Sequence, residues 1–323
     1  MINLLKKLMN NKNIDGYIIP KNDEFFSEYS FPNRLKSISN FSGSAGMAII
    51  LKNKNFLFVD GRYTEQASIE CGKNFKIFEI PNIRPFDILK KSSDKLKLGF
   101  DPKLFTELSL KTNFRDSCTL IPINNNLIDK ICNLKNNSNT KEFYSLSDKV
   151  AGEKTTSKLN KINKILNKKK IDNIFISAPE NCAWLLNIRG FDNPNSPVPN
   201  CQIIINKKKI YFFSDLKKIR KIRNSINYKS IKFFEFKEFV NIINKLKGKN
   251  FSIDKNSCSI FNKSIILSKF FILNEIDPCY QLKAIKNKTE IKSMIDAHIA
   301  DGAALTKFLY WLKNKKKLNI TEL

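Results

Sequence analysis

Residues 41–63 constrain the fold of this chain more than any other stretch, because they combine a glycine-bracketed turn with two short apolar runs. Gly43 and Gly46 bracket the turn, where a positive φ angle would cost little. The apolar runs 47–51 and 56–59 follow, and only polar residues separate them. This pattern predicts a hairpin of two buried strands.

Arg62 lies where the second predicted strand gives way to a predicted helix. Asp60 suits the cap of that helix, and the apolar residues that follow recur with the spacing of one helix face. In open α/β sheets, ligands bind where strands end, so Arg62 is a candidate binding residue. The alternative, that Arg62 only forms a surface ion pair with Asp60 or Glu65, stays open, because surface charges often merely pair.

Predicted strands and helices alternate along both halves of the chain. Helices are expected over 1–13, 84–91, 106–116 and 156–169, and strands over 17–19, 75–80, 96–100, 118–123, 173–177, 203–205 and 210–213. This alternation predicts layered α/β domains. The second half follows the first in the order of its elements, without a close sequence repeat. The asparagine-rich residues 124–139, with a short predicted helix at 127–134, are the best candidate for a linker.

Composition narrows the class of protein and its location. The 323 residues include 42% hydrophobic residues, which predicts two or three domains with real cores. The net charge of +27 suggests a polyanion partner, but the lysines are scattered and no aromatic-interleaved basic motif accompanies them, which disfavours nucleic-acid binding. The 7 cysteines form no C-x-x-C pair, which indicates a reducing compartment. Without an apolar leader or a membrane-spanning run, the sequence predicts a cytoplasmic protein with no membrane partner.

Two further stretches have distinctive chemistry. Residues 192–200 contain three prolines and follow Arg189 and Gly190, which predicts a stiff loop that is either a site rim or an ordinary tight connection. Residues 289–312 repeat apolar side chains at helical spacing. This long helix needs a partner layer, and nothing that follows it in the sequence supplies one. We therefore expect the isolated chain to associate through this helix.

Four motifs together resemble the long, three-domain Xaa-Pro aminopeptidases (aminopeptidase P), members of the creatinase/pita-bread metallopeptidase family. The motifs read F-S-G-S-A-G at 41–46, V-D-G-R-Y at 59–63, A-W-L-L-N-I-R-G at 183–190 with D-x-P-x-x-P at 192–197, and K-A-I-K-N at 283–287 with A-H-I-x-D-G-A-A at 297–304. They fall in the order of the family, and the resemblance covers essentially the whole chain.

The resemblance implies an α/β fold with two creatinase N-terminal-type domains in tandem, each a mixed sheet flanked by helices. It places these domains at 1–137 and 153–277, with a linker at 138–152. Residues 278–323 would then be the start of a truncated pita-bread catalytic domain. Enzymes of this family release the N-terminal residue that precedes a proline. They use two metal ions, usually manganese, held by two aspartates, one histidine and two glutamates.

The sequence departs from the family at the metal site. All five ligands are expected beyond residue 323, so we predict no catalytic residue, no metal ligand and no cofactor for this chain, and no peptidase activity from it alone. The single histidine, His298, matches the A-H-I segment of the first catalytic-domain helix and is expected to be a packing residue. Arg62 matches the family arginine that reaches bound peptide, which makes it the substrate-binding candidate.

Three functional hypotheses remain open from the sequence. The leading one is the N-terminal part of a cytoplasmic Xaa-Pro aminopeptidase, whose full-length form would act on peptides with proline at the second position. The second is a non-catalytic module that binds a peptide or a partner. The third is a basic nucleic-acid-binding protein. A homodimer is also left open, because the dimer contacts of the family lie mostly outside this chain. Whether the chain is itself an enzyme is not decided.

Overall fold

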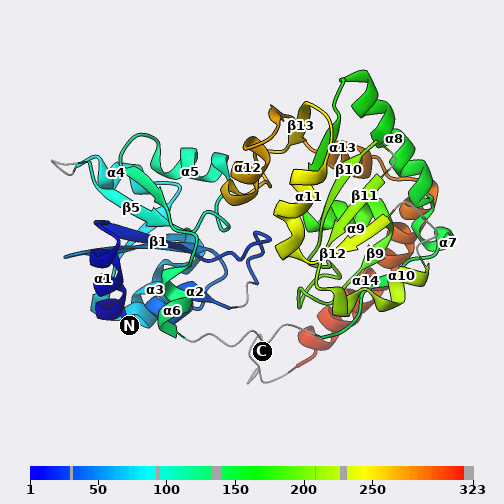
Figure 1. Ribbon diagram of the computed structural model, residues 1–323. Coiled ribbons are helices and arrows are strands. Elements are labelled where there is room, and N and C mark those ends of the chain that lie inside the picture. The colour runs from blue at the N-terminus through cyan, green and yellow to red at the C-terminus, as the bar shows by residue number, and fades with distance from the viewer. Residues whose placement is uncertain (30–31, 92–94, 133–139, 208, 226–230, 316–323) are drawn as a thin grey trace.

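The structure is a computed structural model that describes residues 1–29, 32–91, 95–132, 140–207, 209–225 and 231–315. It contains two α/β units, each built on a six-stranded sheet with helices on its faces (Figure 1). A two-stranded pair, β7 (Tyr144–Ser145) with β9 (Ile188–Arg189), accompanies the second unit. The α/β class predicted from the alternating pattern is confirmed, and so are the mixed sheets that the family resemblance implies.

The first unit has its strands in the order β4-β3-β2-β1-β5-β6. The strands are β1 (Gly16–Pro20), β2 (Gly46–Leu51), β3 (Asn55–Asp60), β4 (Lys76–Ile80), β5 (Lys97–Phe100) and β6 (Thr119–Pro122). The helices are α1 (Ile2–Asn11), α2 (Arg34–Ser39), α3 (Thr64–Cys71), α4 (Pro85–Leu89), α5 (Glu107–Phe114) and α6 (Leu127–Cys132), with short 3-10 turns η1 (Gly61–Tyr63) and η2 (Gly72–Asn74). The predicted hairpin is β2 paired antiparallel with β3.

The second unit repeats this arrangement in the order β12-β11-β10-β8-β13-β14. Its strands are β8 (Asn173–Ile176), β10 (Gln202–Asn206), β11 (Lys209–Phe213), β12 (Ile231–Phe234), β13 (Asn250–Ile253) and β14 (Phe271–Asn274). Its helices are α7 (Asp148–Ala151), α8 (Thr155–Lys168), α9 (Pro179–Leu186), α10 (Arg220–Ser225), α11 (Phe239–Lys245), α12 (Ile260–Leu267) and α13 (Pro278–Ala284), with 3-10 turns η3 (Leu216–Lys218) and η4 (Phe236–Glu238). The similarity in element order that the sequence suggested is therefore a similarity in topology.

One strand of each sheet, β2 in the first and β10 in the second, runs antiparallel to the other five. The carboxyl ends of the five parallel strands therefore lie at one edge of each sheet. Apolar side chains fill both faces of the sheets, because the central strands are buried on both sides, whereas the edge strands β4, β6, β12 and β14 are partly exposed.

The two units contact each other through the start of α12, which lies between them in Figure 1. The N–H of Ile260 donates to the carbonyl of Phe105 at 2.9 Å, and the N–H of Phe261 donates to the carbonyl of Pro102 at 3.0 Å. An ion pair of 2.5 Å joins Lys263 to Glu107 beside these bonds. Loops at the carboxyl edges of the two sheets thus face each other.

The predicted linker region contributes to both units. In α6, Leu127 and Ile128 are buried in the first core. Residues 133–139 lie outside the described residues. Phe143 is fully buried in the second core, within the stretch 138–152 that the sequence assigns to a linker. The proposed division at 1–137, 138–152, 153–277 and 278–323 stays a prediction.

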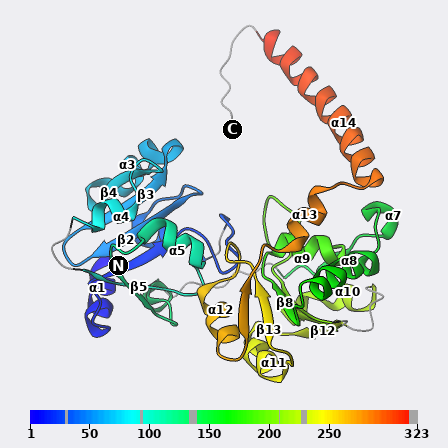
Figure 2. The same cartoon turned by 90° about the horizontal axis from the view of Figure 1, so that it is seen from above.

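The predicted C-terminal helix is α14 (Lys288–Lys313), which Figure 2 shows extending away from both sheets. Its apolar side chains, including Ile295, Ile299 and Phe308, are exposed. The described residues therefore supply no layer that covers this helix. Within that part of the chain, no helix is long and apolar enough to cross a membrane.

Candidate functional site at the carboxyl edge of the first sheet

Arg62 lies at the carboxyl end of β3, as the sequence predicts. Asp60 caps the turn η1 by accepting from the N–H of Arg62 at 3.1 Å, and it also accepts from Arg62 Nε at 2.8 Å. These bonds lower the pKa of Asp60 and raise that of Arg62. The Arg62 side chain is 73% exposed, and it lies beside the Tyr63 ring. The surface pair with Asp60 is therefore present, and the exposed guanidinium still offers donors to a ligand.

The first two family-like motifs meet beside Arg62. The hydroxyls of Ser44 and Tyr63 share a hydrogen bond of 2.9 Å, and the rings of Phe41 and Tyr63 pack edge to face at 5.9 Å. Gly46 relieves crowding here, because a Cβ atom would make a tight contact of 3.2 Å with the carbonyl oxygen of Phe58. These contacts explain why a glycine turn precedes the D-G-R-Y sequence.

A cavity of about 400 Å³ opens at this junction. Its wall includes Gly46 and Asp60 from the motifs, and Asn22, Thr106 and Asn113 from neighbouring loops and α5. The wall therefore offers amide, hydroxyl and carboxylate groups beside the edge where open α/β sheets bind ligands. Such groups suit a polar ligand with a peptide-like backbone.

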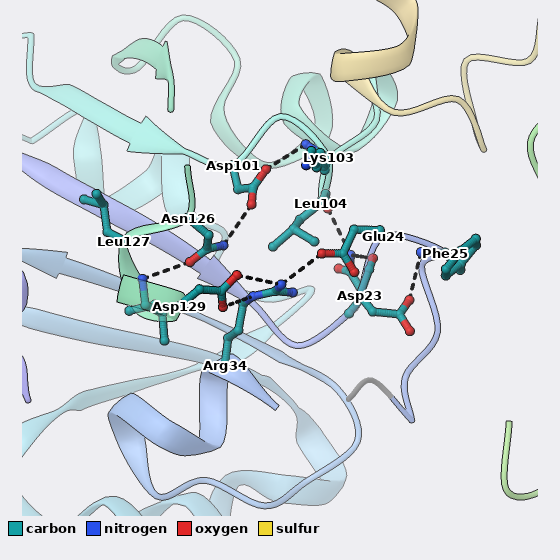
Figure 3. Close-up of polar contacts among 12 residues, drawn as sticks. Asp23, Glu24, Phe25, Arg34, Asp101, Lys103, Leu104, Asn126, Leu127 and Asp129 are labelled. Atoms are coloured by element: carbon teal, nitrogen blue, oxygen red, sulfur yellow. Dashed lines mark hydrogen bonds and ion pairs between the residues drawn. The ribbon is translucent and has the colours of Figure 1, made fainter. Parts of the chain in front are cut away.

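Arg34 holds together a second group of polar residues at the same edge (Figure 3). Its Nε and Nη2 atoms donate to the two oxygens of Asp129 at 2.8 Å and 3.0 Å, and Nη2 also donates to Glu24 at 2.9 Å. The Arg34 side chain is only 6% exposed, and its Nη1 atom is buried without a hydrogen-bond partner in the described structure. An unsatisfied buried donor costs about 1–3 kcal/mol, so this atom calls for an acceptor.

Two buried carboxyls flank the Arg34 group. Burial raises the pKa of Asp101, whose side chain accepts from Asn126 Nδ2 at 3.0 Å. Burial likewise raises the pKa of Asp23, which accepts from two backbone N–H groups. Burial alone would lower the pKa of Arg34, but Asp129 and Glu24 raise it above its usual value. Arg34 is thus a permanent cation inside an otherwise acidic cluster.

The proline-rich loop of the second unit is fixed by a buried ion pair. Lys218 Nζ donates to Asp192 at 2.5 Å, and these side chains are 7% and 4% exposed. The N–H of Asn200 also donates to Asp192, which closes the loop on itself. Gly190 precedes the loop, and a Cβ atom there would lie 2.7 Å from Pro199. These contacts hold the loop in place, and both its stiffness and the choice between its two predicted uses stay predictions.

Comparison with known proteins now identifies the family. The profile of the creatinase/prolidase N-terminal domain matches residues 1–131, and a second profile with the same description matches residues 134–290. The chain belongs to the creatinase/prolidase N-terminal domain family.

Relatives of this creatinase/prolidase-family chain are similar over nearly all of its length. Xaa-Pro aminopeptidase 1 of Dictyostelium discoideum is 31% identical over 96% of the chain and 52% of its own length. A probable Xaa-Pro aminopeptidase P of Pyricularia oryzae is 30% identical over 98% of the chain and 56% of its own length. The chain thus spans about half the length of the curated relatives it matches.

A solved structure has the same fold. The X-prolyl aminopeptidase of Caenorhabditis elegans, described as a cytosolic enzyme with a di-nuclear active site, superposes with a TM-score of 0.85 at 25% identity. The match covers 97% of this chain and 55% of the nematode enzyme.

The described residues of the creatinase/prolidase-family chain do not fit a two-metal site. Across the described ranges, no three side chains of histidine, cysteine, aspartate or glutamate are grouped to hold a metal. His298 lies on α14 and is exposed, so its expected packing role stays a prediction. We derive no reaction step through a metal for this chain.

The last family-like motif anchors α13 and α14 to the second unit. Lys283 Nζ donates to Asn181 Oδ1 at 2.6 Å, and Asn181 Nδ2 donates to Asp277 at 2.7 Å. Asn287 caps α14 and donates to the carbonyl of Ala151 at 2.9 Å. The K-A-I-K-N sequence thus fixes the position from which α14 extends.

The sequence missed the Arg34 cluster. Arg34 lies 95 positions from Asp129, and packing of α2 against α6 brings them together. One feature of the sequence could have indicated the cluster. Arg34 is the first residue of α2, and a cation is unfavourable near a helix N-terminus unless carboxylates compensate its charge.

Proposed function

We propose that this chain forms the N-terminal part of a cytoplasmic Xaa-Pro aminopeptidase, an enzyme that removes the residue preceding proline from a peptide. The observation that carries the proposal is the superposition of 97% of the chain on an X-prolyl aminopeptidase. In this assignment the two α/β units are creatinase-type domains, and α14 is the first helix of a truncated pita-bread domain. The full-length enzyme would hold two manganese ions and act as a monomer or homodimer.

Arg62 is the proposed substrate contact. Its guanidinium is exposed and bonds Asp60, which lines the cavity together with Gly46. An arginine offers several fixed donors, which suit peptide carbonyls or a terminal carboxylate. The chain alone is proposed to bind peptide weakly and not to cleave it, because its described residues include no cluster of side chains that could hold a metal ion.

A cleavage assay tests the catalytic half of the proposal. The purified chain is incubated with manganese and a peptide with proline at its second position, and the released amino acid is quantified. We expect no release, whereas the nematode enzyme under the same conditions provides the positive control. Turnover by the chain alone would contradict the assignment of the metal ligands to an absent part.

A binding assay tests the role of Arg62. A fluorescent peptide with proline at its second position is titrated with the chain, and Arg62→Ala is expected to weaken binding about fivefold. Arg220→Ala is the matched control, because Arg220 is also an exposed arginine whose Nε pairs with one carboxylate, Glu142. If Arg62→Ala and Arg220→Ala weakened peptide binding equally, the result would show only a general effect of positive charge.

Truncation tests the role of α14. Removing residues from 288 onward takes away the exposed apolar side chains and should shift the chain toward monomer in size-exclusion chromatography. The cut belongs after α13 rather than at Pro278, because Cys279 of α13 is buried in the second core. Unchanged association would show that other surfaces cause it.

A non-catalytic peptide-binding module is the second candidate. The described residues include no cluster of side chains that could hold a metal ion, which favours this non-catalytic module. It predicts peptide binding as tight as that of a full-length relative, whereas a partial enzyme is expected to bind more weakly.

A further inference from the structure

A cavity of about 730 Å³ lies between the two units and is distinct from the cavity beside Arg62. Its wall is built from segments that follow the carboxyl ends of strands in both sheets. Phe25 follows β1, Lys103 follows β5, Phe236 follows β12 and Phe261 follows β13. This is the edge at which open α/β sheets bind ligands, and the volume is typical of a small-molecule site.

Aromatic rings make up much of the apolar wall. Phe25 and Phe236, one from each unit, pack edge to face at 5.5 Å. Phe239 and Phe261 add further ring surface from the second unit. A ligand with a flat aromatic body would pack on these rings without reorganising the units.

The charged groups of the wall leave positive charge without a partner. Both carboxylates, Glu24 and Asp129, already accept from Arg34. Lys103 lies over the Phe261 ring at 5.1 Å, and neither it nor Lys237 has an ion pair among the described residues.

Arg34 lines the same cavity, but its Nε and Nη2 atoms already donate to Glu24 and Asp129. Its Nη1 atom is buried, so it offers no donor to an occupant. The positive charge that is open to an occupant is therefore that of Lys103 and Lys237, beside aromatic surface. An occupant of complementary chemistry has an acceptor-rich, negatively charged end and an aromatic body.

We propose that this cavity binds a small aromatic carboxylate, held by Lys103 and Lys237 and packed against the phenylalanine rings of its wall. The proposal does not rest on the peptidase assignment, because none of the cavity residues belongs to the motifs that carry that assignment. Since both units contribute to the wall, binding would also hold them in one relative position.

The probe is 4-(trifluoromethyl)phenylacetate, observed by ¹⁹F NMR on titration with the full chain. The neutral 4-(trifluoromethyl)phenylacetamide is the matched ligand of the same shape. We expect saturable binding of the acid, and binding of the amide weaker by about fivefold, since a partly exposed charge pair contributes up to about 1 kcal/mol.

Three variants locate the site. Lys103→Gln should weaken binding of the acid by about two- to fivefold. Val240→Trp should abolish binding of both ligands, because residue 240 lines the cavity and the indole would fill it. Lys76→Gln is the matched control, since Lys76 also lies over a phenylalanine ring, Phe78 at 5.4 Å, but borders a separate cavity of the first unit.

The proposal is overturned by any of four results. The acid and the amide could bind equally, which would remove the selection for charge. Lys76→Gln could weaken binding while Lys103→Gln does not, which would place the ligand in another cavity. Binding could also be unaffected by every variant, which would place the ligand on a surface such as α14. The acid could also fail to saturate the wild-type chain.

Discussion

The two sheets share one strand order, but the two units stabilise their buried cations differently. In the first unit, Arg34 pairs with carboxylates that are 37% and 42% exposed. In the second unit, Lys218 pairs with Asp192, and both side chains are buried. Lys158, also in the second unit, is 2% exposed and donates only to neutral oxygens of Trp184 and Asn187. The comparison teaches that the cost of removing one member of an ion pair depends on the exposure of the member left behind. A charge that stays buried without a partner cannot be solvated.

The largest effect is expected from breaking the buried pair of the second unit. Asp192→Asn leaves the Lys218 ammonium buried without a countercharge, and such a loss costs about 3–5 kcal/mol. The free energy of unfolding is measured in urea by Trp184 fluorescence, in a Trp311→Phe background that leaves one tryptophan.

Two controls separate charge from packing in this experiment. Glu275→Gln breaks the exposed pair with Lys169 in the same unit and should change stability by less than about 1 kcal/mol. Adding Lys218→Met to Asp192→Asn should recover most of the loss, because no charge is then buried. If the double variant were as unstable as the single one, the loss of stability would come from altered loop geometry and not from the buried charge.

A pH-dependent effect of about 3 kcal/mol is expected from Lys158. Burial lowers its pKa from 10.5 to about 8, while Glu290 and Glu153 oppose the shift. Between pH 8 and 10.5 the unfolded chain therefore binds the proton that the folded chain has lost, so stability rises with pH across that window. The shift of 10.5 − 8 = 2.5 pKa units corresponds to about 3 kcal/mol.

Lys158→Met should remove this rise, because the variant has no group to titrate at that position. Unfolding is followed in urea at pH 7.5, 9 and 10.5. Lys161→Met is the control, because Lys161 lies one turn further along α8 and is exposed. If wild type and Lys158→Met keep the same pH dependence, the buried ammonium is not the cause of it.

A smaller loss is expected from Arg34. Arg34→Met leaves Asp129 and Glu24 without their cation, but both can be solvated, so we expect about 2 kcal/mol instead of the larger cost of a fully buried pair. Amide hydrogen exchange should then speed up about 30-fold in β1 and β2 and stay unchanged in β8 and β10. Lys52→Met, which breaks an exposed pair with Asp15, should leave both sets of rates unchanged. Equal acceleration in the two units would show that they unfold together.

These contrasts also mark how far the sequence could predict the structure. The hairpin at residues 46–60 and the helix α14 were predictable, because short apolar runs bounded by polar residues and an apolar periodicity of about 3.6 are local properties. The position of Arg62 was predictable for the same reason, since Asp60 and Gly61 interrupt the second apolar run. The family motifs added the expectation of two tandem domains.

The buried cations were not predictable, because their partners are distant in sequence. Lys218 lies 26 positions from Asp192, and Lys158 is 29 positions from Asn187. No spacing rule relates such pairs. The i, i+4, i+8 spacing of Lys158, Ile162 and Leu166 places Lys158 on the apolar face of α8, but it does not reveal which groups the ammonium bonds. The cavity between the units was equally hidden, because its wall comes from loops that follow four different strands.

The smallest effect on stability is expected from Arg62, which shares the sheet edge with Arg34 but is exposed. Arg62→Ala should leave hydrogen exchange in β2 and β3 unchanged, because solvent replaces the lost bond to Asp60. The pKa of Asp60, lowered by Arg62, should rise toward its ordinary value, which ¹³C-detected carboxylate titration measures.

This last measurement distinguishes the two interpretations of Arg62. If the pKa of Asp60 rises in Arg62→Ala, the ion pair exists in solution, and a peptide must displace Asp60 or share the guanidinium with it. If the pKa of Asp60 does not change, the Arg62 side chain is not paired with Asp60 in solution and is free to reach a ligand. Faster exchange in β3 would contradict both outcomes, because Arg62 would then hold the strand end in place as Arg34 holds α2 to α6.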